Sequence, residues 1–91
     1  ISLGKADAEM IEYEMESDSA IVGKTLMEIP LPEGTLVNAI IRNGKLIAPT
    51  GNTVIMAGDF LYILSGRKNK PKLKKLLKEK SLYSQDALEL K

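Results

Sequence analysis

The sequence predicts an α+β domain with a small, mostly antiparallel sheet packed with helices. Short runs that alternate apolar and polar residues predict the strands, and turn signals separate them. A lysine-rich segment with leucines at helical spacing predicts a helix near the end of the chain. The predicted order is strand, helix, four strands and helix, at residues 9–16, 23–28, 34–45, 46–49, 53–56, 60–65 and 69–80.

The charges of the chain are unevenly placed. In the predicted strand 9–16 the apolar side chains share one face and the glutamates share the other, as in a half-buried strand. Six acids and no base lie between Asp7 and Asp18, whereas residues 67–80 hold eight bases and one acid. This pattern is typical of a solvated edge strand and a solvated helix face. The alternative is that the basic helix contacts a membrane surface or an acidic partner.

The composition excludes several functional classes. The 91 residues carry a net charge of +1, with no cysteine, no histidine and no apolar run long enough to cross a membrane. No nucleophile motif or phosphate-binding loop is present, so no enzymatic activity is predicted. No aromatic residues accompany the lysines of the helix, which argues against binding to nucleic acid. Same-face glutamates of the first strand lie roughly 6.5–7 Å apart, too loose a spacing to predict a metal site.

The first predicted hairpin holds the candidate site. Asn43-Gly44 is a strong hairpin signal, because both residues tolerate positive φ. With strict alternation in the strand before it, Leu36, Ile40 and Arg42 share a face that is not polar, as a solvent face should be. A domain this small does not bury both faces of a sheet, so a second apolar face predicts another copy, a ligand or both. The Arg42 guanidinium suits a phosphate or carboxylate; alternatively it pairs with a nearby glutamate or merely ends the strand.

An ordered set of residues in the middle of the chain matches a family pattern. The pattern is a G-x-x-L helix, then L-P-x-x-x-x-[VI]-x-x-I-x-R-x-G, a short strand ending in proline, and G-D before an apolar strand. Residues 22–66 thereby resemble the C-terminal domain of RCK modules, also called the TrkA-C domain. The predicted division is a linker at 1–8, this domain at 9–80 and a tail at 81–91. The matching residues are Gly23, Leu26, Pro32, Ile40, Arg42, Gly44, Pro49, Gly58 and Asp59.

The resemblance implies a regulatory role and no catalysis. Domains of this family are cytosolic dimers attached to potassium channels, potassium uptake systems and cation/proton antiporters, and they sense ligands. In some members cyclic di-AMP binds at the two-fold dimer interface, where the arginine-bearing strand, its turn and the return strand contact the phosphates. Carried onto this sequence, the implied ligand-binding residues are Ile40, Ile41, Arg42, Asn43, Gly44, Lys45, Leu46, Ile47, Ala48 and Pro49.

The expected function is a cytosolic ligand-sensing regulatory domain of a potassium or cation/proton transport protein. It is expected to be a homodimer without a cofactor, to take cyclic di-AMP as its candidate ligand, and to lie at the cell membrane through its parent transporter. That parent channel or transporter domain is either fused to it or separate. One alternative is a purely structural dimerisation module that binds no small molecule. Another is a divalent-cation sensor that uses the acidic strand.

Overall fold

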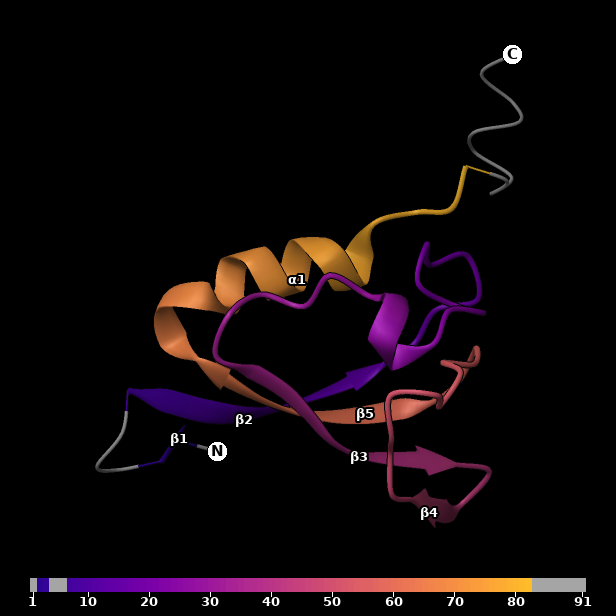
Figure 1. Ribbon diagram of the computed structural model, residues 1–91, viewed down its shortest axis with the longest axis horizontal. Helices are drawn as coiled ribbons and strands as arrows, with labels where there is room; N and C mark the ends of the chain where they lie inside the picture. Colours follow the sequence, from indigo (N-terminus) through magenta and orange to yellow (C-terminus); the bar gives the residue numbers. More distant parts are fainter. Residues whose placement is uncertain (1, 4–6, 83–91) are drawn as a thin grey trace.

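The computed structural model describes residues 2–3 and 7–82, which form one antiparallel sheet with a helix on one face. The strand order is β1-β2-β5-β3-β4, and α1 lies over one face of the sheet (Figure 1). This confirms the predicted α+β class. No helix in the described part of the chain is long and apolar enough to span a membrane. The elements are β1 (Ser2–Leu3), β2 (Ala8–Glu14), η1 (Leu26–Glu28), β3 (Thr35–Arg42), β4 (Lys45–Ile47), β5 (Phe60–Gly66), η2 (Arg67–Asn69) and α1 (Lys70–Lys78), the η elements being 3-10 helices.

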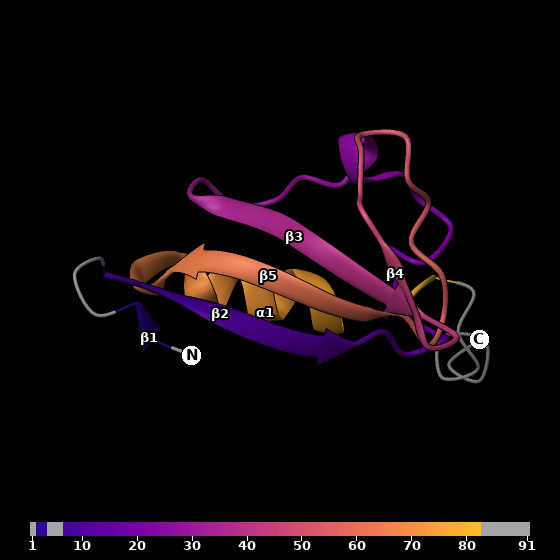
Figure 2. The ribbon, with the colours of Figure 1, turned by 90° about the horizontal axis from the view of Figure 1, so that it is seen from below.

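β5 is the central strand, paired with β2 on one side and β3 on the other. Leu61 and Ile63 point toward α1 and are almost completely buried, as are Leu73 and Leu77 of that helix. These side chains form the centre of the core. Seen from below, the sheet lies in front of α1, and no helix of the described residues covers the near side (Figure 2). The fold is therefore two-layered, with one covered face and one open face.

β3 contains an irregularity that changes which residues face the core. Its register with β5 shifts between Val37 and Ala39. An extra residue in one strand of a pair reverses the alternation beyond it. Val37 and Ile40, three positions apart, therefore both face the core, with exposures of 6% and 0%. The prediction that Ile40 shares a face with Leu36 was wrong, because strict alternation does not hold through the bulge. Ile40 and Arg42 do share a face, as predicted, since the pairing with β4 is regular between them, but it is the face toward the core.

The predicted strand 53–56 does not form a ladder. It makes one isolated bridge, between Thr25 and Val54. The rest of the segment is held by the loop before η1, since Ile55 N–H donates to the carbonyl of Lys24 at 2.9 Å. These hydrogen bonds use backbone groups of residues 53–56 that would otherwise be available to a neighbouring strand. The prediction of a strand at 53–56 was therefore wrong, and this segment is a loop packed against another loop.

The predicted helix 23–28 is reduced to the single turn η1. Thr25 and Glu28 form a capping box: the Thr25 hydroxyl accepts from Glu28 N–H, and the Glu28 carboxylate accepts from Thr25 N–H at 2.9 Å. Ile29 has extended backbone geometry and ends the turn. Pro30 favours that geometry in the residue before it, so the turn is not extended into a longer helix.

The ends of the domain differ in detail from the prediction. The predicted helix 69–80 is α1, preceded by the 3-10 turn η2. Asn69, the residue before α1, makes no side-chain cap and instead donates its side-chain amide to the carbonyl of Glu33 at 2.7 Å. Within the predicted linker, β1 pairs with the first residues of β2. Most of the predicted tail, 83–91, lies outside the described residues.

Candidate functional site

The face of the sheet away from α1 carries a row of apolar side chains. Cross-strand pairing places Ile41 between Phe60 and Leu46. Leu46 is 70% exposed and Leu36 is 57% exposed. The predicted second apolar face therefore exists, although of its predicted members Leu36, Ile40 and Arg42 only Leu36 lies on it. We call it the open face, and its apolar members are Met10, Leu36, Ala39, Ile41, Leu46, Phe60, Tyr62 and Leu64.

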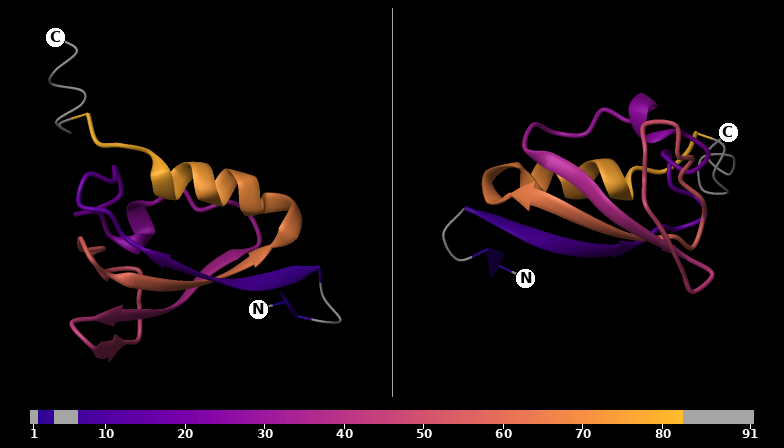
Figure 3. Two further views of the ribbon diagram at one scale, coloured as in Figure 1. Left: turned by 180° about the vertical axis from the view of Figure 1, so that it is seen from behind. Right: turned by 60° about the horizontal axis from the view of Figure 1, so that its bottom comes forward.

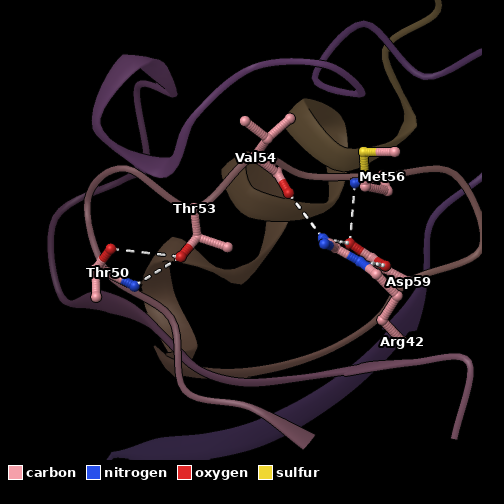
Figure 4. Close-up of polar contacts among 6 residues, drawn as sticks. All are labelled: Arg42, Thr50, Thr53, Val54, Met56 and Asp59. Carbon is pink, nitrogen blue, oxygen red and sulfur yellow. Dashed lines mark hydrogen bonds and ion pairs between the residues drawn. The ribbon is translucent and has the colours of Figure 1, made fainter. Parts of the chain in front are cut away.

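Arg42 is bound to Asp59 rather than extended into solvent (Figure 4). Its Nε and Nη2 donate to the two carboxylate oxygens of Asp59, both at 2.8 Å, and Nη2 also donates to the carbonyl of Val54 at 2.8 Å. Asp59 Oδ2 further accepts Met56 N–H at 2.9 Å. We call this set of four residues the latch. It ties the β3–β4 hairpin to the loop before β5, and the predicted alternative of a glutamate partner is wrong.

The latch holds both of its charged groups ionised. Burial raises the pKa of Asp59, but hydrogen bonds from the Arg42 guanidinium and Met56 N–H, together with the arginine charge, outweigh it and leave that pKa below its ordinary value. Hydrogen bonding to Asp59 raises the pKa of Arg42 against the opposing effect of desolvation. A bidentate pair with a buried carboxylate is a structural element. The fold thus brings together the arginine and the G-D aspartate of the family pattern, which the sequence separates.

The β3–β4 hairpin distributes the predicted ligand-binding residues between core and surface. Ile40 is fully buried and pairs with half-buried Ile47, so both side chains belong to the core side of the sheet. Ile41 and Leu46 lie on the open face. The structure therefore offers a ligand two of these four aliphatic side chains.

The turn of the hairpin is formed as its sequence predicts. Asn43 and Gly44 have φ of 51° and 76°, the left-handed geometry that an Asn-Gly turn supplies. Lys45 directly after them is exposed and lies opposite Arg42 in the pairing of β3 with β4. Figure 3 shows this hairpin at the end of the sheet remote from β1. Two cationic residues and a glycine turn thus lie together at this end of the sheet, and the side chains of the two cations alternate with those of Ile41 and Leu46 and start from the opposite face.

A groove of about 370 Å³ lies between η1, β3 and the turn that follows β4. Predicted site residue Pro49 forms part of its wall, while Ala48 beside it is exposed. Among the described residues, the Thr35 hydroxyl in this groove is buried without a hydrogen-bond partner. Sequence patterns did not reveal the groove, because its walls come from three separate segments. The lining residues are Leu26, Met27, Leu31, Thr35, Leu36, Val37, Pro49, Thr50 and Gly51.

The acidic face of β2 is not assembled for metal binding. Within residues 7–82 no three acidic side chains gather closely enough to hold an ion. Glu12 instead accepts a hydrogen bond from the Tyr62 hydroxyl at 2.8 Å. The alternative of a divalent-cation sensor therefore has no site in the described residues to support it.

Comparison with known proteins identifies the domain. The TrkA-C domain family matches residues 10–78. The Trk system potassium uptake protein TrkA homolog 1 of Methanosarcina mazei is 40% identical over 58 residues, which are 64% of this chain and 13% of that protein. The K(+)/H(+) antiporter NhaP2 of Shewanella oneidensis is 31% identical over 75 residues, 82% of this chain and 13% of that protein. The chain thus spans a small part of the length of these relatives.

Solved structures share the fold. The RCK_C domain dimer of S. agalactiae BusR in complex with c-di-AMP has a TM-score of 0.65 and 25% identity, over 75% of this chain and 93% of that one. An RCK domain with cda has a TM-score of 0.67 and 26% identity, over 76% of this chain and 97% of that one. Both matches cover nearly the whole of the other chain, so the likeness extends over the fold and not over a single motif.

Proposed function

The chain belongs to the TrkA-C domain family, and we propose that it is a cytosolic ligand-sensing regulatory domain of a potassium or cation/proton transport protein. In this proposal two copies associate, cyclic di-AMP binds at the seam between them, and the bound state biases transport. The observation that carries the proposal is the open face, an exposed apolar sheet surface that extends to the Asn43-Gly44 turn, where Arg42 and Lys45 flank the turn.

Association of two copies is supported by the exposure of the open face. Leu36, Leu46 and Phe60 are exposed although they belong to the sheet of a small domain. Covering such a surface removes apolar area from water, and a two-fold axis lets one patch serve both partners. The BusR domain with the same fold is a dimer in complex with c-di-AMP. The open face is therefore the surface that we assign to the seam.

The hairpin offers the chemistry that a cyclic dinucleotide requires. A ligand with two phosphates matches a symmetric seam at which each copy supplies the same cations. In each copy Lys45 is exposed, whereas Arg42 keeps only Nη1 without a hydrogen bond in the described structure. Lys45 and Arg42 Nη1 are the donors that we assign to a phosphate. Ile41 and Leu46 supply flat apolar area for a purine.

The latch gives the bound ligand a route to the rest of the domain. Arg42 connects the hairpin to Val54 and Asp59, and the loop that contains Val54 bridges to Thr25 before η1. A hairpin that shifts on binding therefore carries this loop with it. Transport regulation requires a coupling of only about 1–3 kcal/mol between two states, which a phosphate contact made in one dimer geometry is able to supply.

Calorimetric titration with cyclic di-AMP tests the proposal. We expect saturable heat with one ligand for two chains, as a two-fold site requires. Lys45→Gln and Leu46→Ser are each expected to weaken binding about tenfold. Lys68→Gln, an equal change of charge on η2, is the matched control and is expected to leave binding unchanged. An intact dimer that gives no heat at tens of micromolar ligand would refute the ligand assignment.

Arg42→Ala is a poor test of ligand binding for a structural reason. It leaves the carboxylate of Asp59 buried without its cationic partner, and breaking a buried pair is strongly destabilising. Loss of binding in that variant would follow from damage to the fold as readily as from a lost phosphate contact. The exposed residues of the hairpin avoid this ambiguity.

The alternative function, a structural dimerisation module, is favoured by one observation. Two of the three guanidinium nitrogens of Arg42 are already engaged in the latch, so the arginine of the family pattern has a purpose without any ligand. A chain that dimerises through the open face and binds no cyclic dinucleotide in the same titration would establish this alternative.

A further inference from the structure

A second surface, between β2 and α1, takes no part in the proposed function. A groove of about 290 Å³ separates the strand from the helix. Its floor is apolar and its helical wall carries three lysines at four-residue spacing. The lining residues are Ile11, Glu12, Tyr13, Lys70, Leu73, Lys74, Leu77 and Lys78.

The strand that borders this groove has a free backbone edge. β1 pairs only with the first two residues of β2. At the far end of its ladder with β5, Met15 N–H donates to the carbonyl of Asp59, so the odd-numbered residues of β2 direct their backbone groups to β5. Glu12 and Glu14 therefore direct their N–H and C=O groups to the free edge. No described residue bonds to them there.

Two of the three lysines on the helical wall are free of ion pairs in the described chain. Lys70 Nζ lies 2.7 Å from Glu9 Oε1 and is engaged. Lys74 and Lys78 are exposed and have no such partner. Four residues of a helix advance about 6 Å, and two residues of a strand advance about 6.5–7 Å. Two carboxylates on alternate residues of an extended segment therefore match the spacing of Lys74 and Lys78.

On the open-face side of the β2 edge, a bound segment requires positive rather than negative charge. Residues between those carboxylates would lie on the open-face side, beside the exposed side chains of Glu12 and Glu14. Basic side chains suit that position. A second copy of β2 does not suit the edge, because it would bring glutamates against glutamates. The edge is thus protected against self-association and open to a partner of complementary pattern.

We propose that the groove between β2 and α1 binds an extended peptide segment of a partner protein by strand addition. The segment carries glutamates at alternate positions and basic residues between them. Backbone bonds to Glu12 and Glu14 hold the segment, in the manner of other strand-addition sites. Its carboxylates contact Lys74 and Lys78, while the methylene groups of its glutamates lie on the apolar floor. This inference is independent of the ligand proposed for the hairpin.

Two short synthetic peptides of equal composition test the inference on the full chain. One alternates Glu and Lys, and the other repeats Glu-Glu-Lys-Lys. Only the first presents all its glutamates on one face when extended. We expect the alternating peptide to bind about tenfold more tightly and to slow the hydrogen exchange of the Glu12 and Glu14 amides. Equal binding of both peptides, or no protection of these amides, would overturn the inference.

Paired substitutions on α1 separate the groove from general charge attraction. Lys74→Gln with Lys78→Gln is expected to weaken binding of the alternating peptide about tenfold. Lys72→Gln with Lys75→Gln removes the same charge from the same helix outside the groove, and we expect less than about a twofold effect. Thermal unfolding of both variants confirms that each is folded. Equal losses in both pairs, or binding of α1 to anionic lipid vesicles without binding of the peptide, would contradict a peptide groove.

Discussion

The two faces of β5 have similar sequences and different surroundings. Leu61 and Ile63 lie beneath α1 and are inaccessible, whereas Phe60, Tyr62 and Leu64 alternate with them on the open face. The covered face stabilises the fold through buried apolar area. The open face carries apolar area that no described helix protects. The difference shows that the packing of a single helix decides which half of an apolar strand is buried in the core and which half is left uncovered.

The largest predicted effect distinguishes these two faces directly. Ile63→Ala, on the covered face, is expected to lower the free energy of unfolding by about 3–4 kcal/mol, since it leaves a cavity in the core. Leu64→Ala, the adjacent residue on the open face, is expected to cost about 1 kcal/mol. Urea unfolding at low protein concentration, where association is weak, measures both. Equal losses would show that the open face is packed in the monomer.

The latch is expected to have the next largest effect. Asp59→Asn keeps the shape of the side chain but leaves Arg42 without its counter-charge, and we expect a loss of about 2 kcal/mol at neutral pH. Asp18→Asn breaks the exposed pair with Lys80 and is the matched control, with a much smaller loss. Thermal or urea unfolding compares the two. A loss no larger than that of the control would show that the latch does not stabilise the hairpin.

The same latch predicts the direction of an acid dependence. The pKa of Asp59 is lowered in the folded state. The contribution of this carboxylate to the free energy of unfolding is therefore complete above the ordinary aspartate pKa and is lost as pH falls through the folded-state pKa. Stability should therefore decrease on acidification below about pH 4. The stability of Asp59→Asn should decrease less steeply, because the carboxyl groups whose pKa is still lowered in that variant, such as Asp18, lie on the surface. If the unchanged chain and Asp59→Asn had identical profiles of stability against pH, Asp59 would not be the source of the acid dependence.

The smallest predicted effects differ in sign. Thr35→Val removes a buried hydroxyl that has no partner in the described structure and is expected to stabilise the domain by about 1 kcal/mol. Thr25→Ala removes the cap of η1 and is expected to destabilise it by about 1 kcal/mol. Both are measured by urea unfolding. Loss of stability in Thr35→Val would mean that its hydroxyl has a partner in solution.

Much of the fold follows from local patterns. Alternation in β2 and β5, leucine spacing in α1 and the Asn43-Gly44 turn each reflect a periodicity or a backbone preference that neighbouring residues determine. These signals predict the α+β class and an apolar second face. They depend on neighbouring residues only and not on which distant segments come into contact.

The features that were missed depend on contacts between distant segments. The bulge in β3 moves Ile40 into the core, and it arises from pairing with β5 rather than from a turn signal. Arg42 reaches Asp59 across 17 positions of sequence. The sequence predicted a phosphate or carboxylate, a nearby glutamate or the end of a strand for this arginine, since the loop before β5 comes close to it only in the folded chain. The two grooves are missed for the same reason.

Chemical-shift mapping during titration with cyclic di-AMP tests the central claim most directly. The claim is that the open face and its hairpin form the ligand-binding seam, separate from the groove between β2 and α1. The predicted result is that the resonances of Ile41, Lys45 and Leu46 shift, while those of Lys74 and Lys78 do not. Shifts centred on the lysine groove, or no shifts in a chain that remains dimeric, would contradict it.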